Sequence, residues 1–289
     1  MSWQAIAKKD FQDSVRSKVL WGIIVLFALA IGGIAYLVVD SGVTEGEEAI
    51  VGFLITGVFG VFVLFFIPIT GLFISIKSIV RERESGTINL LLSLPHSRGE
   101  VIFGKFLGRA AVMTITIVVG FIPALGLLIL QTDISATALL VFVFATVLFG
   151  LMFVGIGVGF SALFNSETQG TVGGIVIFFG LFTWQSLTNL LLGVVDYQLP
   201  DFAGRFGLTQ MLRDMFVALT PASAFPAEFP DSRLGLDGGS VVTGSFDGNT
   251  IVFDAGAFYM QNWFVFVILA LWIVVPLAIG YARFNRIDL

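Results

Sequence analysis

The sequence predicts an all-α polytopic membrane protein with six transmembrane helices, on the strength of three observations. Hydrophobic residues make up 57% of the 289 residues and charged residues only 12%, whereas about a quarter of a soluble domain is charged. Six apolar runs are each long enough to cross a bilayer, which takes about 20 helical residues. Basic residues gather in alternate connecting segments, as they do on the cytoplasmic side of membranes.

The six predicted spans follow from these apolar runs. They cover residues 19–39, 50–76, 106–130, 136–163, 171–195 and 261–282. If the N-terminus lies inside, the cytoplasmic segments contain 12 of the 15 basic residues, and the outer segments contain 13 of the 20 acidic ones. This asymmetry predicts that the N- and C-termini are both cytoplasmic. We expect residues 1–289 to form a single transmembrane domain.

Residues 1–18 precede the first span and have the pattern of a short amphipathic helix. Trp3, Ala7, Phe11 and Val15 recur at four-residue intervals, and charged side chains occupy the other side. This pattern predicts an N-terminal interfacial helix in contact with membrane lipid. The alternative is an ordinary cytoplasmic cap on the first span.

The composition excludes several classes of site. The chain has no Cys and a single His, which excludes thiolate chemistry and a His-based metal centre. The formal net charge of −5 argues against a nucleic-acid partner. No ionisable residue lies near the centre of a predicted span, where ion-coupled carriers normally place one. An external energy source is therefore favoured, with a secondary carrier as an alternative.

The stretch GEVIFGKF, residues 99–106, is one residue short of a phosphate-binding P-loop. That motif needs small residues around the phosphates and a Ser or Thr after the Lys to hold magnesium. Here the bulky Val101, Ile102 and Phe103 fill the loop positions, and Phe106 replaces the hydroxyl residue. We therefore expect no ATP site, no cofactor and no catalysis on this chain.

The same stretch fits the start of a helix better than it fits a P-loop. Ser97 and Glu100 have the spacing of a capping box, and Pro95 ends any helix before it. The segment GTINLLLSL, residues 86–94, is short and very apolar, and it lies in the predicted cytoplasmic loop of residues 77–105. A helix of this kind either packs under the chain's own spans or docks into a soluble partner.

The loop sequence ERESGTINLLLSLPHSRGEVIFGKFLGR resembles the signature of the membrane subunits of type-2, exporter-like ABC transporters. The matching residues are Glu82, Arg83, Glu84, Gly86, Thr87, Leu91, Leu92, Pro95, Ser97, Arg98, Glu100, Gly104 and Lys105. The likeness extends to the amphipathic N-terminus, the six spans and the long outer segment. It also covers the tail ARFNRIDL, which is similar to the Phe-x-Arg-x-Asp-Leu ending of these permeases.

The resemblance implies a permease subunit that moves a substrate across the cytoplasmic membrane of a prokaryote. It implies that residues 86–94 form a coupling helix seated in a separate ATP-binding subunit, which holds the ATP and magnesium. The matching residues from Glu82 to Lys105 would then form the ATPase-coupling loop. A second permease copy or a paralogue would complete a dimer. The alternative function is a non-transporting membrane scaffold or assembly factor.

The fifth predicted span contains a polar run that stands out from its apolar surroundings. Thr183, Gln185, Ser186 and Asn189 belong to this run, and they either line a transport pathway or bond to neighbouring helices. The Gly-x-x-x-Gly patterns at 155–159 and 170–174 let helices approach closely. We favour their packing within the chain over a seam between two copies.

The segment between the fifth and sixth spans, residues 196–260, is the long extracytoplasmic part of the chain. Its half-apolar portion, residues 206–229, is too interrupted by polar residues to span, so it is either re-entrant or interfacial. A Gly- and Asp-rich stretch follows, and its composition favours turns and flexibility.

Overall fold

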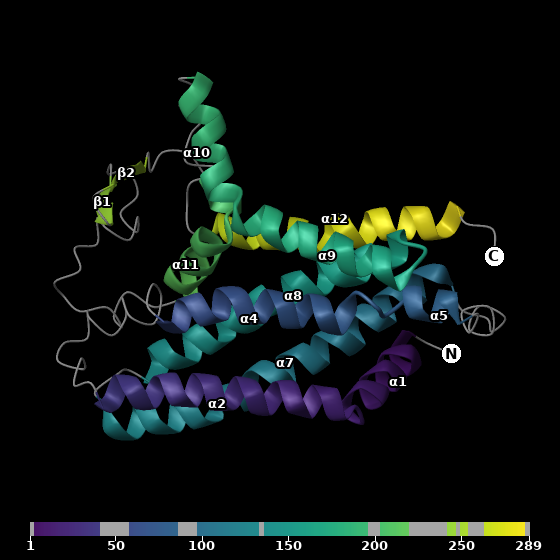
Figure 1. Ribbon diagram of the computed structural model, residues 1–289, viewed down its shortest axis with the longest axis horizontal. Helices are drawn as coiled ribbons and strands as arrows, with labels where there is room; N and C mark the ends of the chain where they lie inside the picture. The colour runs from purple at the N-terminus through teal and green to yellow at the C-terminus, as the bar shows by residue number, and fades with distance from the viewer. Residues whose placement is uncertain are drawn as a thin grey trace.

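The protein is a bundle of long helices that run side by side (Figure 1). The structure, a computed structural model, describes residues 3–40, 58–85, 97–132, 136–195, 203–219, 242–246, 249–253 and 263–286. Five stretches within these residues are long and apolar enough to cross a membrane: Lys18–Asp40, Gly60–Glu84, Arg98–Gln131, Ala136–Leu163 and Phe264–Arg286. The predicted all-α membrane fold is confirmed, whereas the count of six spans stays a prediction.

The helices follow the predicted apolar runs closely. In chain order they are α1 (Trp3–Val15), α2 (Lys18–Asp40), α4 (Val58–Ser75), α5 (Val80–Glu84), α7 (Arg98–Gln131), α8 (Ala136–Leu163), α9 (Glu167–Phe182), α10 (Trp184–Val195), α11 (Leu208–Leu219) and α12 (Phe264–Arg286). Both ends of the described chain lie at the same end of the bundle as α5 (Figure 1). We call this the loop end, because the segment of residues 86–96 departs from it.

Helix α8 lies at the centre of the bundle and packs against α4, α7, α11 and α12. Its aromatic side chains Phe149 and Phe153 are fully buried. Its glycines permit close approach: a Cβ at Gly159 would lie 2.4 Å from the carbonyl carbon of Pro276 in α12, and one at Gly155 would lie 3.1 Å from Cα of Ile273. The expected packing of the Gly-x-x-x-Gly pattern at 155–159 within the chain is therefore confirmed.

The fifth predicted span, residues 171–195, is not one continuous helix. It divides into α9 and α10 at Thr183, and α10 leaves the direction of α9 at a steep angle (Figure 1). The Thr183 hydroxyl donates to the carbonyl of Phe179 at 2.7 Å, an arrangement that bends helices. The Trp184 indole donates to the carbonyl of Ala203 at 2.7 Å. This bond ties the start of α10 to the outer segment.

The outer segment contains a buried helix and a β-hairpin. Leu208, Met211, Met215 and Phe216 of α11 are buried, and α11 packs on α8 and α12. A short 3₁₀ turn, η1 (Gly204–Phe206), precedes it. The part of 206–229 beyond Leu219 lies outside the described residues, so the re-entrant or interfacial placement stays a prediction.

The strands β1 (Val242–Phe246) and β2 (Asn249–Phe253) pair antiparallel, with Phe246 opposite Asn249. The sequence analysis expected turns and flexibility here and missed the pairing. The missed signal is the Asp-Gly dipeptide between the two strands, because Asp-Gly flanked by strand-forming residues is typical of a tight hairpin.

Candidate functional site

Three consecutive residues of α5 each bind a different helix of the bundle. The Glu82 carboxylate pairs with Lys105 of α7 at 2.7 Å. The Arg83 guanidinium donates to the carbonyl of Phe164, at the end of α8, at 2.8 Å. The Glu84 carboxylate accepts from the backbone N–H of Glu167, at the start of α9, at 2.9 Å. Successive side chains of a helix point about 100° apart, so one short helix can hold three neighbours.

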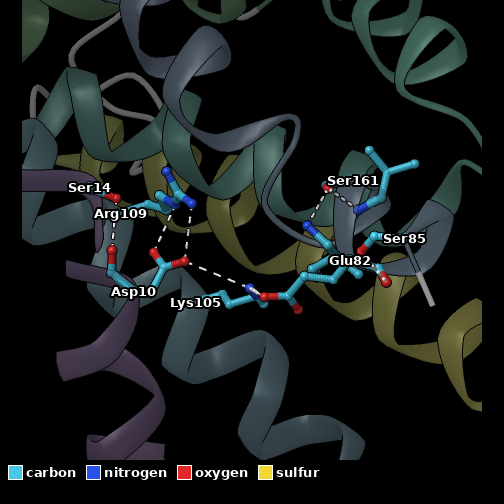
Figure 2. Close-up of polar contacts among 9 residues, drawn as sticks. Asp10, Ser14, Glu82, Ser85, Lys105, Arg109 and Ser161 are labelled. Atoms are coloured by element: carbon cyan, nitrogen blue, oxygen red, sulfur yellow. Dashed lines mark hydrogen bonds and ion pairs between the residues drawn. The ribbon is translucent and has the colours of Figure 1, made fainter. Parts of the chain in front are cut away.

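Lys105 is the centre of a group of four charges, two of them buried and two partly exposed, shown in Figure 2. Its side chain is only 3% exposed, and its ammonium lies 2.7 Å from Glu82 and 3.7 Å from Asp10. Arg109, one turn further along α7, approaches Asp10 at 2.7 Å. Two carboxylates and two cations balance formally, which satisfies the requirement that buried charges be paired.

The charge group includes α1 because α1 packs directly on the backbone of α7. A Cβ at Gly104 would lie 2.9 Å from the carbonyl oxygen of Trp3, and one at Gly108 would lie 2.9 Å from that of Ala7. This approach buries Asp10 to 8% exposure. The amphipathic helix is therefore present, but the face that it turns to the protein carries an acid at its centre. Contact of α1 with lipid stays a prediction.

Helices α5 and α8 complete each other's backbone hydrogen bonding. The first N–H groups of a helix have no partner within it, and the buried Ser161 hydroxyl of α8 accepts from two of them, the N–H groups of Ile79 at 2.8 Å and Val80 at 3.0 Å. In return, Arg83 caps the carboxyl end of α8 by donating to Ala162 as well as to Phe164. The orientation of α5 is thus fixed from both sides, as the Ser161 contacts in Figure 2 show.

The end of the loop that leads into α7 is fixed by the predicted capping box. The Ser97 hydroxyl accepts from the N–H of Glu100 at 3.2 Å, and the Glu100 carboxylate accepts from the N–H of Ser97 at 2.9 Å. The Arg98 guanidinium donates to the carbonyl of Phe284, in the last turn of α12. The capping-box prediction is confirmed, and α7 begins where the sequence indicated.

The predicted coupling residues therefore fall into two groups. Glu82, Arg83, Glu84, Ser97, Arg98, Glu100 and Lys105 gather at the loop end, at the two ends of the segment 86–96. Gly86, Thr87, Leu91, Leu92 and Pro95 lie outside the described residues. We call the first group, together with Asp10 and Arg109, the loop base.

Several members of this arrangement were not predicted from the sequence. Asp10 and Arg109 complete the charge group, Ser161 caps α5, and Phe284 receives Arg98. Asp10 carried no signal in the sequence, because its partners Lys105 and Arg109 lie in a remote part of the chain. The family-like tail contains Phe284, but the pattern alone does not say which residues it contacts.

The P-loop alternative is excluded for residues 99–106 by their geometry. These residues lie inside α7 rather than in a loop. Gly104 faces the backbone of α1, and Lys105 is held by two carboxylates. Neither is available to surround a phosphate, which a P-loop does with free backbone N–H groups and its Lys.

The candidate pathway residues lie at the bend between α9 and α10. Thr183 uses its hydroxyl within its own helix, and Ser186 is exposed. The side chains of Gln185 and Asn189 lie outside the described part of the chain. A role in lining a pathway stays a prediction for all four.

Comparison with known proteins places this arrangement in a family. Residues 4–289 match the family described as ABC-2 family transporter protein. The chain belongs to this ABC-2 family. Because the match extends over nearly the whole chain, it includes the loop base, the helical bundle and the tail of α12. The protein is a multi-pass membrane protein of a transport permease family.

Named relatives agree with this membership. The chain is 31% identical over 183 residues to the probable ABC transporter permease protein NosY of Pseudomonas aeruginosa, covering 61% of the chain and 66% of the relative. It is 32% identical over 116 residues to NosY of Stutzerimonas stutzeri, covering 40% and 41%. It is 30% identical over 119 residues to the probable multidrug ABC transporter permease YbhR of Escherichia coli K12, covering 41% and 30%. The chain thus spans less than two thirds of the length of these curated relatives.

Proposed function

We propose that this ABC-2 chain is the permease subunit of an ABC transporter and that a separate ATP-binding subunit docks at the segment 86–96. The observation that supports this most is the anchoring of both ends of that segment. Glu82, Arg83 and Glu84 bind α7, α8 and α9, and Arg98 binds α12. A force applied to the segment reaches four helices through direct polar contacts.

The chain itself carries no ATPase activity in this proposal. Its Gly-Lys pair lies inside α7, and Lys105 is committed to carboxylates. ATP and magnesium bind to the partner, and two permease copies or two paralogues form the membrane unit. The named relatives are bacterial, which supports placement in the cytoplasmic membrane of a prokaryote. One relative's name includes the word multidrug, so hydrophobic drugs are the first substrates to screen.

Purification from the native host in mild detergent tests the proposal. We expect a stoichiometric partner whose sequence contains Gly-x-x-x-x-Gly-Lys-Ser/Thr, identified by mass spectrometry. A crosslinker placed within residues 86–94 should capture that same partner. If no ATP-binding protein is captured by either route, the scaffold and secondary-carrier alternatives take precedence.

A charge-reversal experiment then tests the role of the loop base. In the complex, Glu82→Lys with Glu84→Lys should abolish the stimulation of ATP hydrolysis by transported drug, while membrane insertion stays normal. Asp13→Lys is the matched control, because Asp13 carries the same charge on the exposed face of α1. Equal stimulation in the double variant and in the control would contradict the role proposed for this loop.

A further inference from the structure

The ring of Phe284 lies between two arginines that belong to opposite ends of the loop. The guanidinium carbons of Arg83 and of Arg98 both lie 5.5 Å from the ring centroid. This distance is within the range of cation–π attraction. The ring is 0% exposed, and Arg98 also donates to the carbonyl oxygen of the same residue.

The two arginines that contact Phe284 come from opposite sides of one chain segment. Arg83 precedes the segment 86–96 in the chain, and Arg98 follows it. One aromatic side chain of α12 therefore joins the two ends of a segment that is remote from it in sequence. Tyr281, one turn earlier in α12, supports the same contact, because its ring lies 3.4 Å from where a Cβ on Gly99 would be.

Helix α12 continues from this contact into the bundle. Four residues before Phe284, Gly280 lies against Gly159 of α8, where a Cβ would come within 2.5 Å of the Gly159 carbonyl oxygen. The main chains of α8 and α12 touch, so a displacement of Phe284 cannot be absorbed by side chains between the two helices. The last turn of α12 is thus fixed to the loop on one side and to the bundle core on the other.

We propose that Phe284 is a positioning residue that transmits movement of the segment 86–96 to α12, by holding Arg83 and Arg98 against one ring. This inference rests on the proposed function and extends it, since it names the side chain through which α12 responds to ATP. It also assigns a physical role to the first residue of the tail pattern: the Phe supplies a flat, electron-rich surface to two cations.

A competing explanation is that Phe284 only fills space. Two substitutions separate these explanations. Phe284→Leu keeps an apolar side chain but removes the π surface, whereas Phe284→Tyr keeps the π surface. As a second route, Phe284→Met supplies a flexible apolar side chain that fills space and likewise lacks the π surface.

The experiment uses the full permease in complex with its ATP-binding subunit, in lipid nanodiscs. Because the chain has no Cys, one introduced Cys carries an environment-sensitive dye without background from the permease, provided that the partner is made Cys-free. Dye at Arg81→Cys, beside the loop, reports docking and nucleotide response, since that side chain is 76% exposed. Dye at Ile279→Cys, on the exposed side of α12, reports whether the response reaches α12. The probe added is MgATP with vanadate.

We expect both dyes to respond to MgATP in the otherwise unsubstituted protein and in Phe284→Tyr. In Phe284→Leu and in Phe284→Met, the Arg81 dye should still respond, and the Ile279 signal should fall roughly fivefold or more, because the cation–π contacts of both arginines are lost. An unchanged Ile279 signal in both variants overturns the role of Phe284 and leaves the proposed function standing. A silent Arg81 dye in the unsubstituted complex overturns the docking proposal itself, and the role of Phe284 with it. If Phe284→Leu does not assemble, Phe284→Met decides.

Discussion

Replacing Lys105 by Met tests the charge group at the loop end most directly. Met preserves the length and apolar stem of the side chain and removes only the ammonium, so the packing of α7 against α1 is retained. The change leaves two carboxylates, Asp10 and Glu82, without the cation between them. If the charge group holds α1 and α5 on α7, the folded state loses stability.

The size of the effect follows from what each carboxylate retains. Removing one partner of a fully buried ion pair costs about 3–5 kcal/mol. Here Asp10 keeps Arg109 at 2.7 Å, and the Glu82 side chain is 29% exposed and keeps part of its hydration. We therefore expect a loss of about 2 kcal/mol, below the range for a fully buried pair. For a protein of this size that corresponds to a fall of roughly 4–8 °C in the unfolding temperature.

The assay is thermal unfolding in detergent, followed by circular dichroism, on the parent, Lys105→Met, Glu82→Gln, the double variant and one control. Removing the charge of Glu82 eliminates the carboxylate that Lys105→Met leaves uncompensated, so the double variant should recover about 1 kcal/mol relative to the sum of the single effects. Lys77→Met is the control, because Lys77 pairs with Glu167 at the surface, with side chains 43% and 30% exposed, and such pairs contribute about 0–1 kcal/mol.

Two results would refute the reasoning. If Lys105→Met is no less stable than Lys77→Met, the charge group does not hold the loop end together. If the effects of the Lys105 and Glu82 substitutions add without coupling, the 2.7 Å contact contributes nothing specific, and α5 is held by its backbone contacts to α8 instead.

Three further predictions address other parts of the chain. Charge reversal of Glu82 and Glu84 to Lys should leave insertion intact but abolish the stimulation of ATP hydrolysis by substrate in the complex, measured in proteoliposomes. Gly108→Val should displace α1 from α7, because there is no room for a side chain between the two helices at that position. Limited proteolysis should then cleave residues 1–18 several-fold faster. Gly126→Val is the control and should leave the cleavage rate unchanged, because a Cβ at Gly126 would have no neighbour within 4 Å. Replacing Arg205 by Met should lower the free energy of unfolding by about 3 kcal/mol, because it leaves the buried carboxylate of Asp214 without the cation that lies 2.9 Å from it. An unfolding temperature equal to the parent's would show that the stability of the outer segment does not depend on that pair.

Hydropathy and local capping rules predicted the long helices well, since both depend on neighbouring residues alone. The predicted span 136–163 coincides with α8, and the span 19–39 lies within α2. The start of α7 followed from the Ser97 capping box, which needs only four consecutive residues. For these helices the controlling interactions are local, and the pattern indicated the structure.

The burial of Asp10 could not be predicted in the same way. In sequence, an acid beside Lys8 and Lys9 is indistinguishable from a solvated charge on the polar side of an amphipathic helix. Its burial depends on Lys105 and Arg109, which lie almost 100 residues further along the chain. The bend at Thr183 was hidden for a related reason: hydropathy averages over a window, and a single hydroxyl bonding to its own helix leaves that average unchanged.

In the loop base, a motif that was matched by family resemblance makes contacts that explain each of its residues. The pattern Glu82-Arg83-Glu84 was matched as a motif, and the structure supplies a separate physical reason for each residue. An acid is needed opposite Lys105, a long planar cation at the carboxyl end of α8, and an acid at the amino end of α9. The two helix-end positions agree with the preference of helix termini for opposite charge.

The contact between α8 and α12 limits the motions that are open to the bundle. Where Gly159 meets Gly280 and Pro276, main chain lies on main chain, and sliding one helix along the other would drive the next side chains into that backbone. The first helices of the bundle are joined in a similar way, since the Phe27 ring of α2 occupies the space over Gly120 of α7. Two rigid bodies follow, α2 with α7 and α8 with α12. An opening toward either face of the membrane then has to come from a tilt of one body against the other at the contact between α7 and α8. Helix α4 moves with α8, because a Cβ at Gly71 would lie 2.9 Å from the Cβ of Phe153.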